Sequence, residues 1–334
     1  MRKILASLLV LVLLLSCARA EGFYYTCTSV TGCTQTSSIY DRFYGSGELS
    51  VIIPGLKEGL TPQGIAYLPE EDWLLFAGYR SDEKQSALIA VDRKSETVVK
   101  EVFLQYGDGG DYHGHAGGVC VTDTDIYLSN AGKLFGISLE TFRQLPPSGN
   151  CRFEQEIPVP VNSSFCCCDD GILWVGEFQY GLDYRTDASH RVKTADGRQL
   201  AWICGYRMDE NRDFVKPDMI LSVTERIQGI AVRNGSIYLS QSYGRRNTAA
   251  VYRYDGVLIR EPDGNADVNG EQVPLWILDS SVLSGTLLCP PMTECLCNVP
   301  EGICMLFESA AENYRGPDSP SQNPLDRVFL LRDF

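Results

Sequence analysis

QGIAVRNGSIYLSQS, residues 228–242, consists of a short apolar run, an Asn-Gly turn and a second apolar run that ends in polar residues. An Asn-Gly pair between two such runs is a strong signal for a β-hairpin. The same plan recurs at residues 63–79, 117–131, 164–178 and 294–309. Similar hairpins repeated along one chain indicate a repeat architecture, in which each unit buries its apolar faces against its neighbours.

Further apolar runs follow each hairpin. We expect third and fourth strands in the first four units; those of the fourth unit fall at 250–256 and 273–280. The fifth unit has a third strand at 327–334, and residues 47–54 offer its missing fourth strand. Four-stranded units around an axis form a β-propeller, and pairing between the two ends of the chain hides its open edges.

We therefore predict an all-β fold: a five-bladed propeller at 47–334, closed by an N-terminal strand, after a signal peptide at 1–20 and a polar leader at 21–46. A six-bladed ring is the alternative if residues 180–222 contain another blade. One position of each first strand holds a small residue: Ala66, Cys120, Cys167, Ala231 and Cys297. Innermost strands crowd together at the axis, so these three cysteines are interpreted as packing residues rather than metal ligands or disulfides.

The N-terminus predicts export. A basic start, an apolar run and small residues up to Ala20 are typical of a cleaved signal peptide. The residues before Cys17 also resemble a bacterial lipobox, so the protein is expected to be secreted or extracellular, with lipid anchoring through Cys17 as the alternative. In an oxidising compartment Cys27 and Cys33 are the pair we most expect to form a disulfide; a bridge from Cys289 to a neighbour is a weaker expectation.

The charge and hydropathy of the chain limit the classes of partner that it can bind. The formal net charge is −14, and no basic cluster interrupts it, which argues against nucleic acid as a partner. No stretch beyond the leader approaches the length of a transmembrane helix. We therefore expect either a small polar molecule or a cell-surface partner. The sequence does not indicate the oligomeric state.

Several motifs are similar to those of a known protein family. They are HAGGV (115–119), QGIAV (228–232) with LSQSYGRRN (239–247), and PPMTEC (290–295) with LFESAAENYR (306–315). With them the chain resembles a family of exported bacterial β-propeller proteins to which no activity is assigned. YVTN-repeat and gluconolactonase-like propellers are more distant analogues. The resemblance implies a propeller and export, and it brings no catalytic residues with it.

Polar residues at the starts of first strands and the ends of second strands should surround the two mouths of the channel. The first set is Gln63, His115, Ser164, Gln228 and Glu294, and the second is Gly78, Asn130, Glu177, Gln241 and Glu308. We predict that Gln63, His115, Gln228 and Gln241 bind a polar ligand there. A solvated channel without a ligand is the alternative.

The loop SYGRRN (242–247) should lie near the same mouth. Arg245 suits a carboxylate or phosphate, and Tyr243 suits a sugar or aromatic ring. Residues 180–200 form a long polar stretch that we expect to cover the mouth, with Tyr184 and His190 able to reach a ligand.

Catalysis is the second hypothesis. Glu177, Glu294 and Glu308 are the candidate acid and base residues of a metal-assisted hydrolase or lactonase. Candidate ligands of a divalent cation such as calcium are His113, His115, Asn130, Glu177 and Glu308. His113 and His115 share one face only if residues 113–117 are extended, and two nitrogens alone make a poor metal site. No serine-hydrolase elbow, P-loop or dinucleotide motif occurs.

Overall fold

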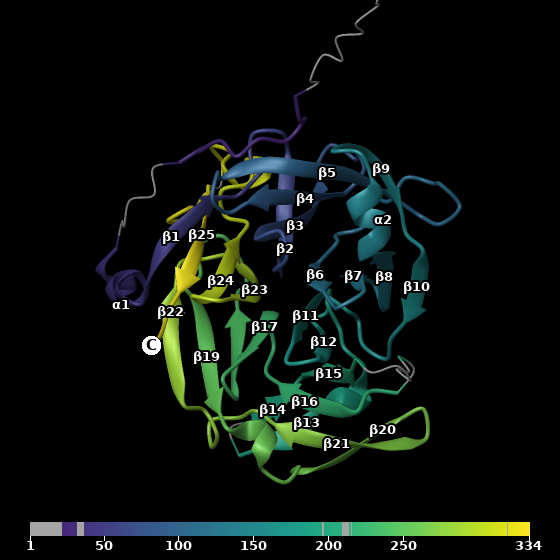
Figure 1. The fold of residues 1–334 in the computed structure, drawn as a ribbon. Helices are drawn as coiled ribbons and strands as arrows, with labels where there is room; N and C mark the ends of the chain where they lie inside the picture. The colour runs from purple at the N-terminus through teal and green to yellow at the C-terminus, as the bar shows by residue number, and fades with distance from the viewer. Residues whose placement is uncertain (1–21, 32–36, 196, 209–213, 215, 319) are drawn as a thin grey trace, which may run out of the picture.

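The computed structural model describes residues 22–31, 37–195, 197–208, 214, 216–318 and 320–334. Five sheets stand around one axis in this part of the chain (Figure 1), which confirms the predicted all-β, five-bladed propeller. No helix of the described residues has the length and apolar character needed to cross a membrane. The helices are short: α1 (Asp41–Gly45), α2 (Leu139–Gln144), η1 (Ser38–Tyr40), η2 (Ala188–His190), η3 (Val257–Ile259) and η4 (Glu312–Tyr314).

Each blade begins at the axis and continues outward by antiparallel pairing. The inner strands are β2 (Leu60–Leu68), β6 (Gly118–Val121), β11 (Phe165–Asp169), β17 (Ile227–Arg233) and β23 (Thr293–Val299). The second strands are β3 (Trp73–Arg80), β7 (Asp125–Asn130), β12 (Ile172–Gly176), β18 (Ser236–Gln241) and β24 (Gly302–Phe307). The third strands are β4 (Ala87–Asp92), β8 (Lys133–Ser138), β15 (Ala201–Arg207), β19 (Ala249–Asp255) and β25 (Arg327–Leu331).

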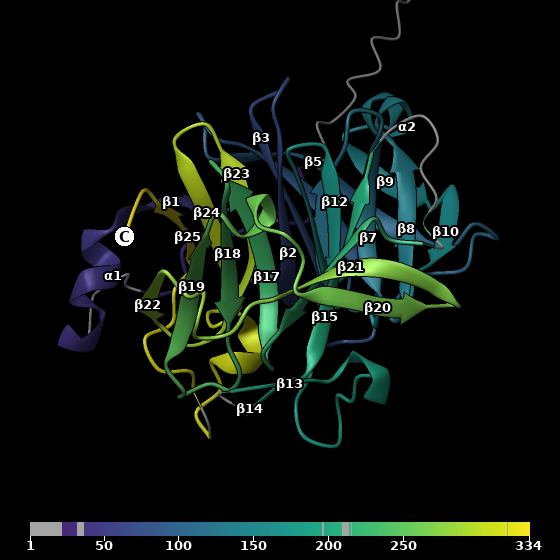
Figure 2. The ribbon, with the colours of Figure 1, turned by 90° about the horizontal axis from the view of Figure 1, so that it is seen from below.

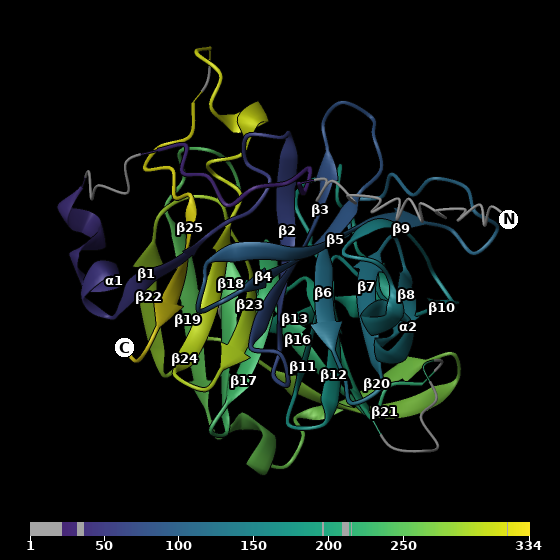
Figure 3. The same ribbon diagram turned by 45° about the horizontal axis from the view of Figure 1, so that its top comes forward.

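The outermost strands show how the ring closes. The fourth strands are β5 (Thr97–Gln105), β10 (Gln155–Pro158), β16 (Met219–Val223), β22 (Gly285–Cys289) and, in the fifth blade, β1 (Gly47–Ile52). β1 pairs antiparallel with β25, with Gly47 opposite Leu331 and Leu49 opposite Phe329 (Figure 3). The predicted closure by an N-terminal strand is therefore confirmed.

One strand assignment was wrong. Residues 273–280 were expected to be the fourth strand of the fourth blade, but β22 takes that place beside β19. Instead β21 (Glu271–Ile277) pairs in parallel with β16 of the third blade, and β20 (Gly264–Val268) continues that sheet outward (Figure 2). The physical reason is burial: Val273 and Leu275 pack into the same apolar cluster as Ile220 of β16.

The six-bladed alternative was also wrong. Residues 180–222 hold β15 and β16 of the third blade and the small hairpin of β13 (Val192–Thr194) and β14 (Gly197–Gln199). β9 (Ser148–Arg152) is a further addition, parallel to β5 on the outside of the first blade.

Close packing at the axis explains the small residues. Ala66, Cys120, Cys167, Ala231 and Cys297 are all buried, and the described cysteines are free thiols. A Cβ on Gly118 of β6 would lie 2.3 Å from the backbone nitrogen of Cys166 in β11, closer than side-chain atoms approach backbone. Cys17 and Cys33 lie outside the described residues, so the lipid anchor and the Cys27–Cys33 bridge stay predictions.

The described part of the leader packs on the propeller. Glu101 accepts hydrogen bonds from the backbone nitrogens of Tyr24 and Tyr25, both at 2.9 Å, and Tyr25 is fully buried. Asp326 accepts from the backbone nitrogens of Val30 and Thr31 at 2.8 and 2.9 Å. Residues 22–31 thus connect the first blade with the chain that enters β25.

Candidate functional site

The hairpin registers bring two sets of polar residues to one mouth of the ring. Ile227 at the start of β17 pairs with Gln241 at the end of β18, and Thr293 pairs with Phe307 in the same way. Starts of inner strands and ends of second strands therefore lie at the same mouth. The two sets of polar residues, which were expected to surround the two mouths, therefore lie at one end of the channel.

Two carboxyl groups meet at this mouth. Glu294 belongs to β23, and Glu308 directly follows β24, with its backbone nitrogen donating to the carbonyl of Met292 at 3.1 Å. The two carboxyl groups are hydrogen-bonded to each other, so one of them holds a proton. We call Glu294 and Glu308 the carboxyl dyad.

Two predicted carboxamides hold the dyad. Gln63 Nε2 donates to Glu308 Oε2 at 2.8 Å, and Gln228 Nε2 donates to Glu294 Oε1 at 3.2 Å. Gln63 comes from the first blade, Gln228 from the fourth and the carboxyls from the fifth. Three adjacent blades therefore position one acidic centre.

Burial controls the protonation of the dyad. Glu294 is only 2% exposed, and its burial raises its pKa well above the usual range, with the nearby charge and hydrogen bond of Glu308 acting in the same direction. Glu308 is half-buried toward the mouth, and burial raises its pKa to about 7 against the lowering effect of its hydrogen bonds. Near neutral pH the dyad thus offers both a proton donor and proton acceptors.

Aromatic and cationic side chains surround Glu308. Tyr314 is hydrogen-bonded to Glu308, and its hydroxyl oxygen lies 3.4 Å from that of Tyr79. The guanidinium of Arg245 lies 4.9 Å from the ring centroid of Tyr314, and its charge favours ionised Glu308. The ring of His115 lies 4.6 Å from that of Tyr79. Neighbouring protein atoms remove part of the hydration of His115 and lower its pKa, which favours the neutral imidazole.

Glu177 lies apart from the dyad, inside the third blade. Its Oε2 accepts from the backbone nitrogen of Trp202 at 3.0 Å and from His190 Nδ1 at 2.9 Å, and its Oε1 accepts from the backbone nitrogen of Asn162 at 3.3 Å. Glu177 is 1% exposed, and the His190 ring stacks on Trp202 at 3.8 Å. These contacts tie the 180–200 segment to the blade.

Gln241 and Tyr243 lie between the third and fourth blades. Gln241 donates to the carbonyl of Glu225 at 2.9 Å and accepts from the Tyr252 hydroxyl at 2.8 Å. The ring of Tyr243 packs against that of Tyr180, with centroids 3.9 Å apart and ring planes tilted by 31°. The 180–200 segment therefore meets the SYGRRN loop through aromatic rings. Tyr184 is 51% exposed at the edge of this group, next to Phe178.

The two histidines of the HGH motif diverge. Residues 113–117 are not extended, because the chain bends at Gly114 and Ala116 has a φ of 49°. His115 lies beside Tyr79, whereas His113 lines a separate pocket with Tyr24 and Phe103. The condition for a shared face is thus not met.

The candidate cation ligands do not converge. Asn130 ends β7 beside Gly114, Glu177 is held within the third blade, and Glu308 is part of the dyad. Among the described residues no group of three or more His, Cys, Asp or Glu side chains is arranged to hold a metal ion.

Sequence reasoning missed Tyr79, Tyr314 and Tyr180. Tyr79 follows Gly78 at the end of a predicted second strand, so its position pointed to the mouth. Tyr314 comes six residues after Glu308 in a loop, where alternation along a strand offers no guide.

The opposite end of the channel has a small pocket lined by residues of four inner strands, including Cys120, Cys167 and Cys297. Asp169 lies there and accepts from the backbone nitrogen of Val232 at 2.8 Å and from Asn298 Nδ2 at 2.7 Å. Burial raises the pKa of Asp169 to about 6.

Comparisons with known proteins find similarity in structure and none in sequence. No family model matches the chain, and no curated protein matches it. The hydrazine synthase of Kuenenia stuttgartiensis is 12% identical with a TM-score of 0.36, over 73% of this chain and 55% of that one. The Myxococcus xanthus glutaminyl cyclase is 14% identical (TM-score 0.37, 75% and 86% covered), and a Xanthomonas campestris gluconolactonase is 11% identical (TM-score 0.34, 76% and 74% covered). Similarity this weak carries no argument about activity.

Proposed function

We propose that the protein binds a small polar ligand at the mouth formed by the carboxyl dyad, Gln63 and Gln228. The observation that carries this proposal is the dyad: two carboxyl groups from adjacent strands meet in a buried place that raises both their pKa values, and a carboxamide from a different blade bonds to each of them. Most polar groups at strand ends need only a backbone partner, whereas this arrangement concentrates donors and acceptors at one point.

The surroundings define the chemistry of the ligand. The singly protonated dyad can donate one hydrogen bond and accept several, which suits hydroxyl, amide or amine groups. The partly exposed rings of Tyr243 and Tyr180 offer a stacking surface for a sugar or aromatic ring, and Arg245 supplies positive charge. A cell-surface partner would bind here by presenting hydroxyl, amide or amine groups to the dyad. The signal peptide predicted at residues 1–20 supports export of the protein, which would place the mouth outside the cell.

Acid–base hydrolysis is the second candidate function, and the shared proton favours it. At pH 7 a singly ionised carboxyl pair can activate water with one group and protonate a leaving group with the other. This version draws on Glu294 and Glu308 and needs no metal. The calcium-assisted version remains a separate hypothesis, with its candidate ligands distributed over several places.

Thermal-shift measurements on the purified protein test both functions. The panel holds neutral sugars, sugar acids, lactones, amino acids, amines and calcium chloride, with Glu308→Gln and Gln228→Ala as variants. The exposed Glu312, replaced by Gln, is the control. We expect at least one class to raise the melting temperature of the wild type and the control, and the effect to fall at least about tenfold in apparent affinity in the variants.

Stabilisation that persists in both variants, or a panel without any stabilising compound, would contradict the binding proposal. Lactone and ester hydrolysis, measured with and without EDTA, tests the enzyme candidate. Activity that survives EDTA and disappears in Glu308→Gln supports acid–base chemistry at the dyad. Calcium stabilisation abolished by EDTA would instead support the cation hypothesis.

A further inference from the structure

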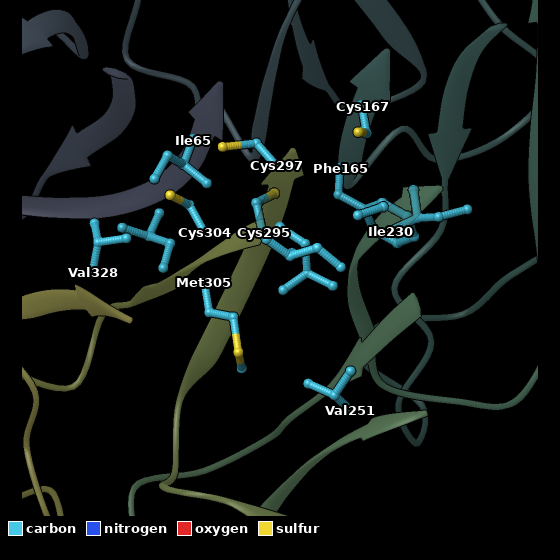
Figure 4. Close-up of a cluster of buried hydrophobic side chains, with 14 of the residues drawn as sticks. Ile65, Phe165, Cys167, Ile230, Val251, Cys295, Cys297, Cys304, Met305 and Val328 are labelled. Carbon is cyan, nitrogen blue, oxygen red and sulfur yellow. The ribbon is translucent and has the colours of Figure 1, made fainter. Parts of the chain in front are cut away.

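Two thiols face each other across the hairpin of the fifth blade. Cys297 of β23 is directly opposite Cys304 of β24 in the antiparallel register. Opposite residues in such a ladder have Cα atoms about 4.5–5.5 Å apart, within the range of about 4.4–6.8 Å that disulfides need. In Figure 4 the two sulfur atoms lie close together beside Ile65.

Both thiols are deep in the protein. Cys297 is 5% exposed and Cys304 is 1% exposed. Burial, followed by the hydrogen bond with Cys304, raises the pKa of Cys297 well above its usual range. Because exchange requires a thiolate that an oxidant can reach, the folded protein should react slowly in either direction. Oxidation must therefore take place while the fifth blade is still open.

We propose that Cys297 and Cys304, which are free thiols in the structure, form a disulfide when the chain folds in an oxidising compartment, so that Cys297 has a role beyond packing at the axis. The oxidant is an accessible disulfide, either a small molecule such as oxidised glutathione or a disulfide-bearing oxidoreductase. One thiolate attacks it and releases a first thiol, and the second cysteine then displaces the remaining thiol. The pair loses two electrons and two protons, and the oxidant becomes two thiols. This modification site is independent of the proposed ligand function.

The bond would join the two strands that carry the dyad. Glu294 lies three residues before Cys297 on β23, and Glu308 lies four residues after Cys304 beyond β24. The ladder between these strands has a register shift between Thr293 and Leu296, which weakens it next to the dyad. A covalent link at the regular end of the ladder would restrict separation of the two strands.

Refolding followed by peptide mapping tests the proposal. The full chain is denatured, reduced, and refolded either with a mixture of reduced and oxidised glutathione or with excess dithiothreitol. Unreacted thiols are then alkylated under denaturing conditions, and the digest is analysed by mass spectrometry without reduction. We expect a peptide linked through Cys297 and Cys304 in the glutathione sample only.

Matched variants distinguish the Cys297–Cys304 disulfide from oxidation at other cysteines. Cys304→Ser should abolish the linked peptide and leave Cys297 alkylated, whereas Cys289→Ser, a change at another buried cysteine, should leave the linked peptide in place. Circular dichroism checks that each variant folds. The glutathione-refolded wild type should also unfold at a higher temperature than the reduced form, and Cys304→Ser should lose this difference.

Full alkylation of Cys297 and Cys304 in glutathione-refolded, natively folded wild type would overturn the proposal. Linkage of either residue to another cysteine would overturn it as well.

Discussion

The shared proton of the carboxyl dyad should make the stability of the protein depend on pH, and the dependence can be measured without knowing a ligand. Burial raises the pKa of Glu308 from 4.5 to about 7, whereas the unfolded chain retains the ordinary value. Between these two pH values the folded state binds more protons than the unfolded state. The free energy of unfolding therefore falls as pH rises.

The size of the effect follows from the shift. The rise in the pKa of Glu308 from 4.5 to about 7 corresponds to about 3 kcal/mol, most of which is lost between about pH 5 and about pH 8. Glu308 is half-buried, and water near its carboxyl group reduces this value, so we expect about 1–2 kcal/mol. The raised pKa of Glu294 acts in the same direction.

Urea unfolding at about pH 5 and about pH 8 measures this loss. The variant Glu294→Gln, Glu308→Gln keeps the shapes of the side chains and one acceptor oxygen in each, but it cannot titrate. The wild type should lose about 1–2 kcal/mol more than this variant between the two pH values, and Glu312→Gln should behave like the wild type. Equal losses in the wild type and the double variant would refute the shared, buried proton.

Two other substitutions test the architecture. Gly118→Ala should cost more than about 3 kcal/mol or prevent folding, because the new Cβ would meet the adjacent inner strand at 2.3 Å; Gly264→Ala, with no atom within 4 Å, should cost less than about 1 kcal/mol. Similar urea midpoints for these two variants would contradict crowding at the axis. His190→Ala should cost about 2–4 kcal/mol, because it removes a buried ring and a 2.9 Å hydrogen bond to Glu177, while exposed His113→Ala should stay within about 0.5 kcal/mol. A mild effect of His190→Ala in thermal denaturation would mean that the 180–200 segment is held by other contacts.

The architecture could be predicted from the sequence because its determinants are local and repeated. Alternation over a few residues and a turn pair such as Asn234-Gly235 are sufficient to define a hairpin. Five such hairpins, with a small residue at the same position of each first strand, imply a crowded ring. The N-terminal strand at 47–54 was the one remaining partner for the fifth blade, so closure followed as well.

Strand partners outside this repeat could not be predicted in the same way. Residues 273–278 form an apolar run that fits the edge of either the third or the fourth blade. The choice depends on which edge buries Val273 and Leu275, and that information lies in β16, some fifty residues earlier in the chain.

The candidate site was likewise predictable in part from local sequence patterns and in part only from the tertiary structure. The sequence by itself determined that Gln63, Gln228, Glu294 and Glu308 stand at strand ends that face the mouths of the channel, because strand ends follow from the hairpin pattern. It did not show that all four share one mouth. Only the tertiary structure decided that Glu294 and Glu308 meet while Glu177 bonds to His190. Side chains at strand ends are aimed by the tilt of each blade and by neighbours from other blades, and no local pattern of residues encodes those directions.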